Sequence, residues 1–245
     1  MSPSSAAAEA DFTQVPVPEA TPVYVWELPV RASHWIIFIS VAVLAVTGFY
    51  IGHPFLIVSG RARDHFVMGW MKVIHFYTAI VFVLALLERF VWMFVGNRYA
   101  RWNQFIPTTS TRFRDFVRTL RFYLFLREHP PAAVGHNPLA GVTYVVVFVL
   151  YFIMMVTGLA LYSGNAAIGS PGRALHFLIP LLGGLQAARW LHHVGMWLLF
   201  GFIVHHIYSA VMYSMVERNA TTESIFTGYK FVRPSALKEA CGDDE

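Results

Sequence analysis

Apolar residues gather in four long segments of this chain, and polar residues gather in the stretches between them. The four segments cover residues 34–52, 71–95, 139–162 and 189–215. An α-helix needs roughly 20 predominantly apolar residues to cross the hydrocarbon core of a bilayer, and each segment is about that long. The pattern therefore predicts an all-α integral membrane protein, with a bundle of four transmembrane helices forming a membrane domain at residues 30–216.

The two ends of the chain lack such segments. Residues 1–29 are rich in Ala, Pro and Glu and contain no Lys or Arg. We predict that they form a mostly disordered cytoplasmic tail, which becomes ordered near Tyr24–Pro29. Residues 217–245 are predicted to form a polar cytoplasmic tail.

The longest stretch between spans, residues 96–138, is rich in arginine. It holds seven arginines against two acidic residues, whereas the other two loops hold three arginines together. Short loops that carry an excess of Lys and Arg lie in the cytoplasm, so this loop and both termini are predicted to be cytoplasmic. Arginines and aromatic residues recur at helical spacing over residues 112–126, which predicts an amphipathic helix on the inner leaflet.

The fourth apolar segment carries two adjacent pairs of histidines, His192–His193 and His205–His206. Ionisable side chains within a membrane span are costly and usually functional. At about 100° per residue, a spacing of 14 returns to nearly the same helix face, about 21 Å further along the axis, whereas spacings of 12 or 13 do not. Among the pairings between the two pairs, only His192 with His206 has the favourable spacing, so these two are predicted to share one face.

Histidines in the first two spans provide partners for this face. His34 begins the first span and His75 lies near the start of the second. With the arginine-rich loop inside, His34 and His206 lie toward the inner surface, and His75 and His192 lie toward the outer surface. Two neutral imidazoles on one haem iron give closed axial coordination, which suits electron transfer. We therefore predict two b-type haems, an inner one on His34 and His206 and an outer one on His75 and His192. A different interpretation is that these histidines only form hydrogen bonds between helices.

Cysteine usage decides the haem type. Cys241 is the single cysteine, and the Cys-x-x-Cys-His motif that attaches haem covalently is absent. Side-chain ligation and packing alone must then hold any haem, as in b-type cytochromes.

Two residues lie 14 positions after a predicted ligand, and therefore on nearly the same helix face. Gly48 follows His34, and a glycine there would let a flat macrocycle approach the backbone or would let helices pack closely. Arg89 follows His75 and could pair with a haem propionate. It could equally reach the membrane interface or pair with Glu88.

A quinone site near the inner haem is a further hypothesis, because quinone reduction consumes two protons. His136 and Asn137, at the cytoplasmic entrance of the third span, have the right position. Asn137-Pro138 also has the pattern of a helix start with proline in the first turn.

Composition agrees with the membrane assignment. Of 245 residues, 56% are hydrophobic and 13% are charged, and mean hydropathy is +0.52. The formal net charge of +4 comes from basic residues concentrated in one loop, so it indicates no nucleic-acid partner.

Six stretches together resemble one family, the b-type cytochrome subunits of membrane-bound nickel–iron uptake hydrogenases. They begin at Glu27 (ELPVRASHW), Val46 (VTGFYIG), Val95 (VGNRYAR), Gly135 (GHNP), Thr157 (TGLALYS) and His192 (HHVGMW). The resemblance extends from about residue 22 to residue 230. The family's first motif usually has an aromatic residue directly before the first histidine, where this chain has Ser33. That difference affects haem packing and leaves the ligand in place.

The resemblance implies a bacterial inner-membrane anchor for a periplasmic hydrogenase. Its partners would be an iron–sulfur small subunit and a nickel–iron large subunit, and electrons would pass from the outer haem to the inner haem and then to a membrane quinone. The subunit would have no hydrogen-splitting site of its own. Two alternatives stay open: a cytochrome b subunit of another oxidoreductase, of the formate dehydrogenase or thiosulfate reductase type, and a histidine-lined metal transporter.

Overall fold

The computed structural model describes residues 20–55, 66–131 and 133–234. The predicted disorder of the first residues falls mostly on residues 1–19, outside the described part. The same holds for residues 235–245 of the predicted C-terminal tail and for Arg61 and Arg63 of the first outer loop.

Four long helices dominate the fold, as predicted. They are α1 (Leu28–Gly52), α2 (Val67–Val95), α4 (Pro138–Asn165) and α6 (Leu185–Glu217), and each is long and apolar enough to cross a membrane. Each helix is longer than its predicted span, because residues at the span ends continue the helical hydrogen-bonding beyond the apolar segment. For example, α1 begins well before His34 and has Pro29 in its first turn, where a missing N–H costs nothing.

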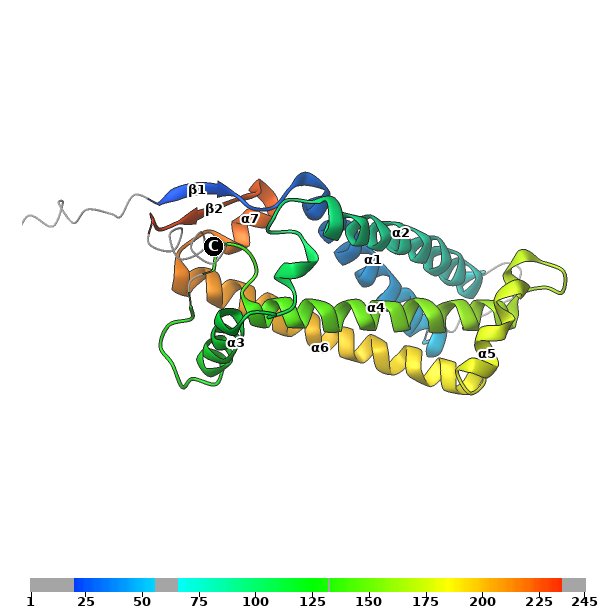
Figure 1. Cartoon of the computed structure of the whole chain (residues 1–245). Helices are drawn as coiled ribbons and strands as arrows, with labels where there is room; N and C mark the ends of the chain where they lie inside the picture. Colours follow the sequence, from blue (N-terminus) through cyan, green and yellow to red (C-terminus); the bar gives the residue numbers. More distant parts are fainter. Residues whose placement is uncertain (1–19, 56–65, 132, 235–245) are drawn as a thin grey trace, which may run out of the picture.

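The four helices pack as two hairpins. α1 lies mainly against α2, and α4 lies mainly against α6 (Figure 1). Large apolar side chains point outward along the bundle, for example Val46 (71% exposed) and Val204 (70% exposed). Such surfaces are stable in contact with lipid tails, so the exposed apolar faces agree with a membrane protein.

One end of the bundle carries a small sheet. Strand β1 (Thr21–Tyr24) pairs antiparallel with strand β2 (Tyr229–Val232), which follows the short helix α7 (Thr221–Thr227) (Figure 1). The sheet therefore joins segments from opposite ends of the sequence. Within the described part of residues 217–245, the chain is folded against the N-terminal segment, which the sequence did not predict.

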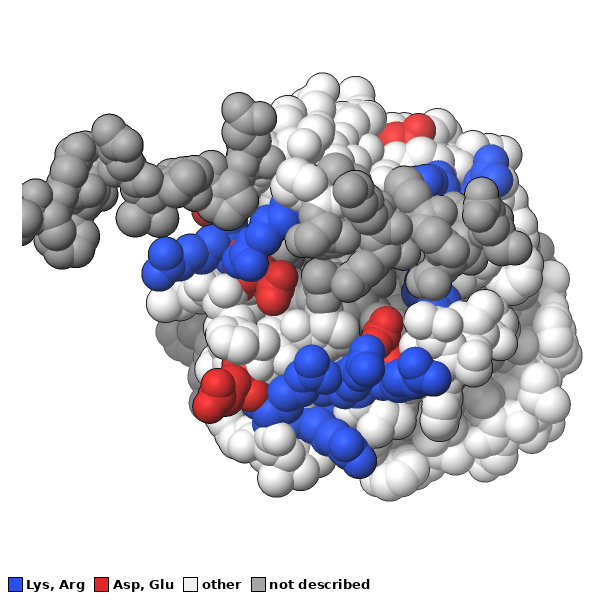
Figure 2. All heavy atoms as spheres, turned by 60° about the vertical axis from the view of Figure 1, so that its left-hand side comes forward, with Lys and Arg blue, Asp and Glu red and all other residues white. Residues whose placement is uncertain are grey.

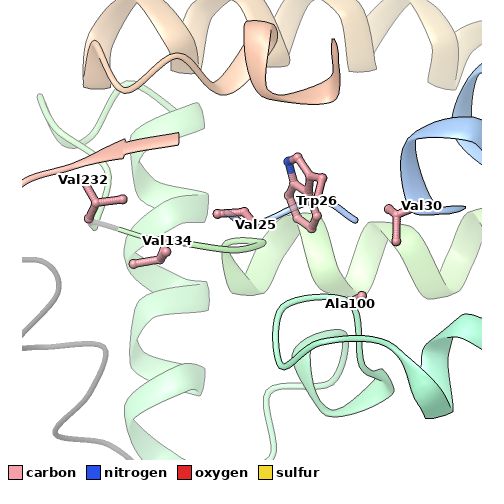
Figure 3. Close-up of a cluster of buried hydrophobic side chains, with 6 residues drawn as sticks. All are labelled: Val25, Trp26, Val30, Ala100, Val134 and Val232. Atoms are coloured by element: carbon pink, nitrogen blue, oxygen red, sulfur yellow. The ribbon is translucent and has the colours of Figure 1, made fainter. Parts of the chain in front are cut away.

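A compact apolar cluster lies under this sheet (Figure 3). It consists of Val25, Trp26, Val30, Ala100, Val134 and Val232. Glu27 links the start of α1 to the end of α2, because its Oε2 accepts hydrogen bonds from Trp92 Nε1 (2.8 Å) and from the backbone N–H of Asn97 (2.7 Å). Segments from four parts of the chain thus form one closed end of the bundle.

The arginine-rich segment lies at the same end. The helix predicted over residues 112–126 is present as α3 (Ser110–Tyr123), and the Thr109 hydroxyl caps its first turn by accepting from the Arg112 N–H. Blue side chains gather on this end of the molecule in Figure 2. The shorter elements are η2 (Trp102–Gln104) before α3, and η3 (Pro171–Phe177) and α5 (Leu178–Leu181) at the opposite end.

Candidate functional site

Helix α6 presents two histidines to the α1–α2 hairpin, each facing one partner. The ring centroids of His75 and His192 are 6.5 Å apart, and those of His34 and His206 are 6.3 Å apart. The two pairs lie at different levels of the bundle, because His192 is near the start of α6 and His206 is several turns further along it. The structure therefore brings together the same pairs that the sequence predicts.

The spacing within each pair fits a metal between the rings. Two metal–nitrogen bonds of about 2 Å each, added to the half-widths of two imidazole rings, separate the ring centres by roughly 6 Å. Each pair supplies two nitrogen ligands, which is the number that a haem iron takes outside its porphyrin plane. The residues thus fit bis-histidine haem, while ligation itself stays a prediction.

Hydrogen bonds around His75 indicate which ring nitrogen is free. Thr47 Oγ1 lies 2.7 Å from the carbonyl oxygen of Val43, to which it donates, and 2.9 Å from His75 Nδ1. When the hydroxyl proton is used toward the carbonyl, Oγ1 is left as the acceptor for Nδ1–H, and we assign this tautomer to His75. Nε2 then carries the lone pair, and the hydrogen bond fixes the ring orientation.

The same arrangement recurs at His192 in the other hairpin. Thr157 Oγ1 donates to the carbonyl oxygen of Ile153 (2.7 Å) and accepts from His192 Nδ1 (2.8 Å). In both hairpins a glycine follows the threonine and leaves room for the ring. A Cβ at Gly48 would lie 3.1 Å from His75 Cε1, and one at Gly158 would lie 3.4 Å from His192 Cε1. The repeated Thr-Gly pair therefore orients both histidines of the outer pair.

The inner pair has different surroundings. His34 Nδ1 is shielded from solvent and has no hydrogen-bond partner. Aromatic rings contact this pair instead, with Trp35 edge-on to His34 at 5.2 Å and Phe202 stacked on His206 at 5.5 Å. The two pairs are therefore chemically distinct.

The neighbouring histidines lie elsewhere. The ring of His205 is 6.1 Å from Tyr123 of α3. His193 Nδ1 is 2.9 Å from the Arg189 carbonyl oxygen, and its ring is 6.5 Å from the exposed His53 at the end of α1. No threonine orients either of these rings among the described residues, so we continue to predict that His193 and His205 are not ligands.

Arg89 is deeply buried, with 3% of its surface exposed. Its guanidinium carbon lies 5.1 Å from the centre of the Tyr144 ring and 5.7 Å from that of Phe105. No salt bridge joins Arg89 to Glu88 in the described part of the chain, although the two side chains interact electrostatically. The three expected roles of Arg89, at the membrane interface, beside Glu88 or on a haem propionate, therefore stay predictions.

His136 and Asn137 have separate surroundings. Asn137 caps α4, because its Oδ1 accepts from the Ala140 N–H at 2.8 Å, which confirms the expected helix start. The ring of His136 lies among three aromatic side chains, Trp26, Phe105 and Tyr144. Burial, together with smaller effects of nearby positive charges, lowers the pKa of His136 to about 3. The ring is therefore neutral at physiological pH.

Three residues that contact these sites were not predicted from the sequence: Thr47, Thr157 and Lys230. The threonines had a visible signal, since a Thr-Gly pair occurs in two different spans. Lys230 had none, because only the pairing of β1 with β2 brings it beside Trp26, where its Nζ lies 5.6 Å from the ring centre.

Comparison with known proteins decides the family. The model of the prokaryotic cytochrome b561 family matches residues 25–228, which include all four long helices and both histidine pairs. The chain belongs to this family. Membership in a family of b-type cytochromes implies haem b as the cofactor, in agreement with the fit of the histidine pairs.

Similar curated proteins cover most of the chain. A probable Ni/Fe-hydrogenase B-type cytochrome subunit from Bradyrhizobium diazoefficiens is 37% identical over 94% of this chain and 95% of its own length. The probable Ni/Fe-hydrogenase B-type cytochrome subunit of Cupriavidus necator is 37% identical over 84% of this chain and 86% of its own. The probable Ni/Fe-hydrogenase 1 B-type cytochrome subunit of Escherichia coli K12 is 38% identical over 84% of this chain and 90% of its own.

Proposed function

We propose that this cytochrome b561-family protein is the dihaem cytochrome b subunit of a membrane-bound nickel–iron hydrogenase. It would anchor the iron–sulfur small subunit and the nickel–iron large subunit at the outer face of the bacterial inner membrane. It would relay their electrons across the bilayer to the quinone pool. The partner assignment is supported by the names of the relatives, which all refer to Ni/Fe-hydrogenase.

The observation that carries the relay is the placement of two histidine pairs at two levels of α6. A straight helix fixes His192 and His206 about 21 Å apart along its axis. Haem bound at each pair would supply one-electron redox chemistry with both axial positions closed. The protein's own residues would set the spacing, orient the imidazoles through Thr47 and Thr157, and exclude water with apolar side chains.

The direction of transfer follows from the charge distribution. The end of the bundle that carries α3 and the sheet also carries exposed arginines, including Arg114, Arg118 and Arg121 (Figure 2). The positive-inside rule assigns this end to the cytoplasm. The His75–His192 pair then lies toward the periplasm, where electrons would enter, and the His34–His206 pair lies toward the cytoplasm. The quinone site belongs near that second pair, and a role of His136 or Asn137 in it stays a prediction.

The test uses the tagged chain purified together with its partners. Mass spectrometry of the purified complex should identify hydrogenase subunits, and a formate or thiosulfate oxidoreductase in their place would overturn the partner assignment. His206→Ala should abolish hydrogen-dependent quinone reduction and leave hydrogenase activity with an artificial dye intact. His205→Ala, on the same helix, is the matched control and should keep both activities. Full quinone reduction by a His206→Ala complex that has lost one haem would contradict the relay.

A further inference from the structure

A group of buried cationic side chains lies at the sheet end of the bundle, beside the His34–His206 pair. Arg89 and Lys230 are each only 3% exposed. Aromatic rings link both to His136, because Tyr144 contacts Arg89 and His136, and Trp26 contacts Lys230 and His136. Ser33 and Glu88, the chain neighbours of His34 and Arg89, line one groove, so the group lies at the level of the His34–His206 pair.

Glu88 interacts electrostatically with Arg89, and Glu217 with Lys230, but neither carboxylate forms a salt bridge with its cation in the described part of the chain. Arg89 Nη1 forms no hydrogen bond, and Nη2 has only a long one to the carbonyl oxygen of Ala100, at 3.4 Å. The hydroxyl of Tyr144 also approaches the guanidinium, but it is a neutral group. Lys230 Nζ donates one hydrogen bond, to the carbonyl oxygen of Gly135 at 3.3 Å.

In the described part of the chain, neither residue forms an ion pair. A buried charge without a partner is strongly destabilising, so such groups normally have a counter-ion. An anion bound within hydrogen-bond distance would therefore stabilise both cations.

The nearest carboxylates do not fill this role. Glu88 precedes Arg89 on α2, and consecutive helical residues point about 100° apart. Glu88 lines a groove on the α1–α2 face with Ser33 and Trp92, whereas Arg89 faces Phe105 and Tyr144. Glu217 raises the pKa of Lys230 somewhat, but burial dominates and lowers that pKa to about 8.

Aromatic rings connect the two cations. Phe105 and Tyr144 stack 4.3 Å apart beneath the Arg89 guanidinium, and Trp26 lies between His136 and Lys230, 4.6 Å from the imidazole. His136 Nδ1 is also shielded from solvent and has no hydrogen-bond partner. Polar groups from α2, from the segment before α4, and from β2 thus lie around the same aromatic rings.

We propose that Arg89, His136 and Lys230 form a carboxylate-binding site that takes the propionate groups of the haem held between His34 and His206. A guanidinium and an ammonium group are suited to bind carboxylates through charge-assisted hydrogen bonds. Haem b carries two propionate carboxylates, and Arg89, His136 and Lys230 would hold these groups while His34 and His206 would hold the iron. The proposal rests on the proposed haem function. It adds the residues that would hold the propionates and so orient the haem between His34 and His206.

The proposal also gives the terminal sheet a role. Lys230 is the partner of Val23 in the β1–β2 pairing, so the sheet fixes where the ammonium group lies. Haem binding and closure of this end of the bundle would then support each other.

The experiment compares protohaem with its dimethyl ester, in which both propionates are blocked. The full chain is produced in haem-deficient cells and loaded in lipid nanodiscs with either form. Wild-type protein should retain protohaem at least tenfold better than the ester at one of its two sites, and His206→Ala should remove that preference. Arg89→Gln and Lys230→Gln should each reduce the preference several-fold, whereas Arg121→Gln, on the exposed face of α3, should leave it unchanged.

The outcomes separate the two proposals. If the wild-type chain binds neither form, the haem function itself fails. If haem binds but the ester is retained equally well, or if the preference survives Arg89→Gln and Lys230→Gln, the carboxylate site is wrong. Arg89→Lys, which keeps the charge, provides a folded comparison if Arg89→Gln does not fold, and it should retain most of the preference.

Inorganic phosphate tests a free anion as the occupant. The wild-type protein loaded with protohaem should bind no phosphate at this site, because the propionates would already fill it. Phosphate binding by the loaded protein that is lost in Arg89→Gln would show that the cations serve a soluble anion, and would overturn the propionate assignment.

Discussion

At the scale of single residues, the outer histidine pair depends on two threonine hydroxyls. Each hydroxyl is committed to a carbonyl of its own helix, so it can only accept from the imidazole Nδ1–H. This arrangement leaves Nε2 free on both rings and makes them stronger donors to a metal. The inner pair lacks it, so we expect the two haems to differ in midpoint potential.

Replacing Thr47 or Thr157 with valine tests this difference. Each substitution removes the acceptor of Nδ1–H, weakens the imidazole as a donor, and should raise the midpoint potential of the outer haem. Outer-haem affinity should also fall, by about 10- to 100-fold. Redox titration of the purified protein measures the first effect. Thr143→Val is the matched control, because the Thr143 hydroxyl also donates to a carbonyl of α4 but contacts no histidine. Equal potentials in all three variants would contradict the assigned role.

Residue patterns predicted the histidine pairs because helix geometry alone relates His192 to His206. They could not predict how the threonines are used, since the contact of Thr47 with His75 depends on how α1 packs against α2. Arg89 shows the same limit. Its place on the face of His75 followed from spacing, but its burial between aromatic rings depends on residues from distant segments.

At the scale of elements, the end of the bundle is held by contacts between segments that are far apart in the sequence. Glu27 accepts two hydrogen bonds from the end of α2. Trp26 Nε1 donates to Ser224 Oγ of α7 at 3.0 Å, and the guanidinium of Arg31 donates to the Phe226 carbonyl oxygen. The four long helices were predictable from their apolar length, and α3 from its arginine and aromatic spacing. The β1–β2 pairing was not, because two short strands at opposite ends of the sequence leave no local periodicity.

Substituting Glu27 with alanine should destabilise this end. Trp92 Nε1 and the Asn97 N–H would both lose their acceptor, and an unsatisfied buried donor costs about 1–3 kcal/mol. The melting temperature in detergent should fall by several degrees, since about 1 kcal/mol corresponds to roughly 2–4 °C in a chain of this size. Glu128→Ala removes an exposed carboxylate from a loop and should leave the melting temperature unchanged. A similar effect of both substitutions would show that charge, and not these two hydrogen bonds, is responsible.

At the scale of the whole molecule, the charge distribution predicts a direction across the membrane. Both described ends of the chain and α3 lie at the arginine-rich end, and η3 and α5 lie at the other (Figure 1). This arrangement agrees with the predicted topology, in which an even number of spans returns the chain to its starting side. The side itself follows from the positive-inside rule.

Reporter fusions test this orientation. Of two reporters placed after Thr109, before α3, green fluorescent protein should be active and alkaline phosphatase inactive, because this position is predicted to be cytoplasmic. After Gly169, in the loop between α4 and η3, alkaline phosphatase should be active and green fluorescent protein inactive, because this position is predicted to be periplasmic. Alkaline phosphatase and green fluorescent protein at each position give opposite readouts and serve as controls for each other. The reverse pattern would invert the direction of electron transfer.

The central claim is that His34 with His206, and His75 with His192, each hold one haem. The most direct measurement is the haem-to-protein ratio, determined as the pyridine haemochrome, for alanine variants of these four residues and of His193 and His205. We predict two haems per chain in the wild-type protein and in His193→Ala and His205→Ala, and a loss of about one haem in each of the other four variants. Two haems retained in His206→Ala, together with loss in His205→Ala, would contradict the account.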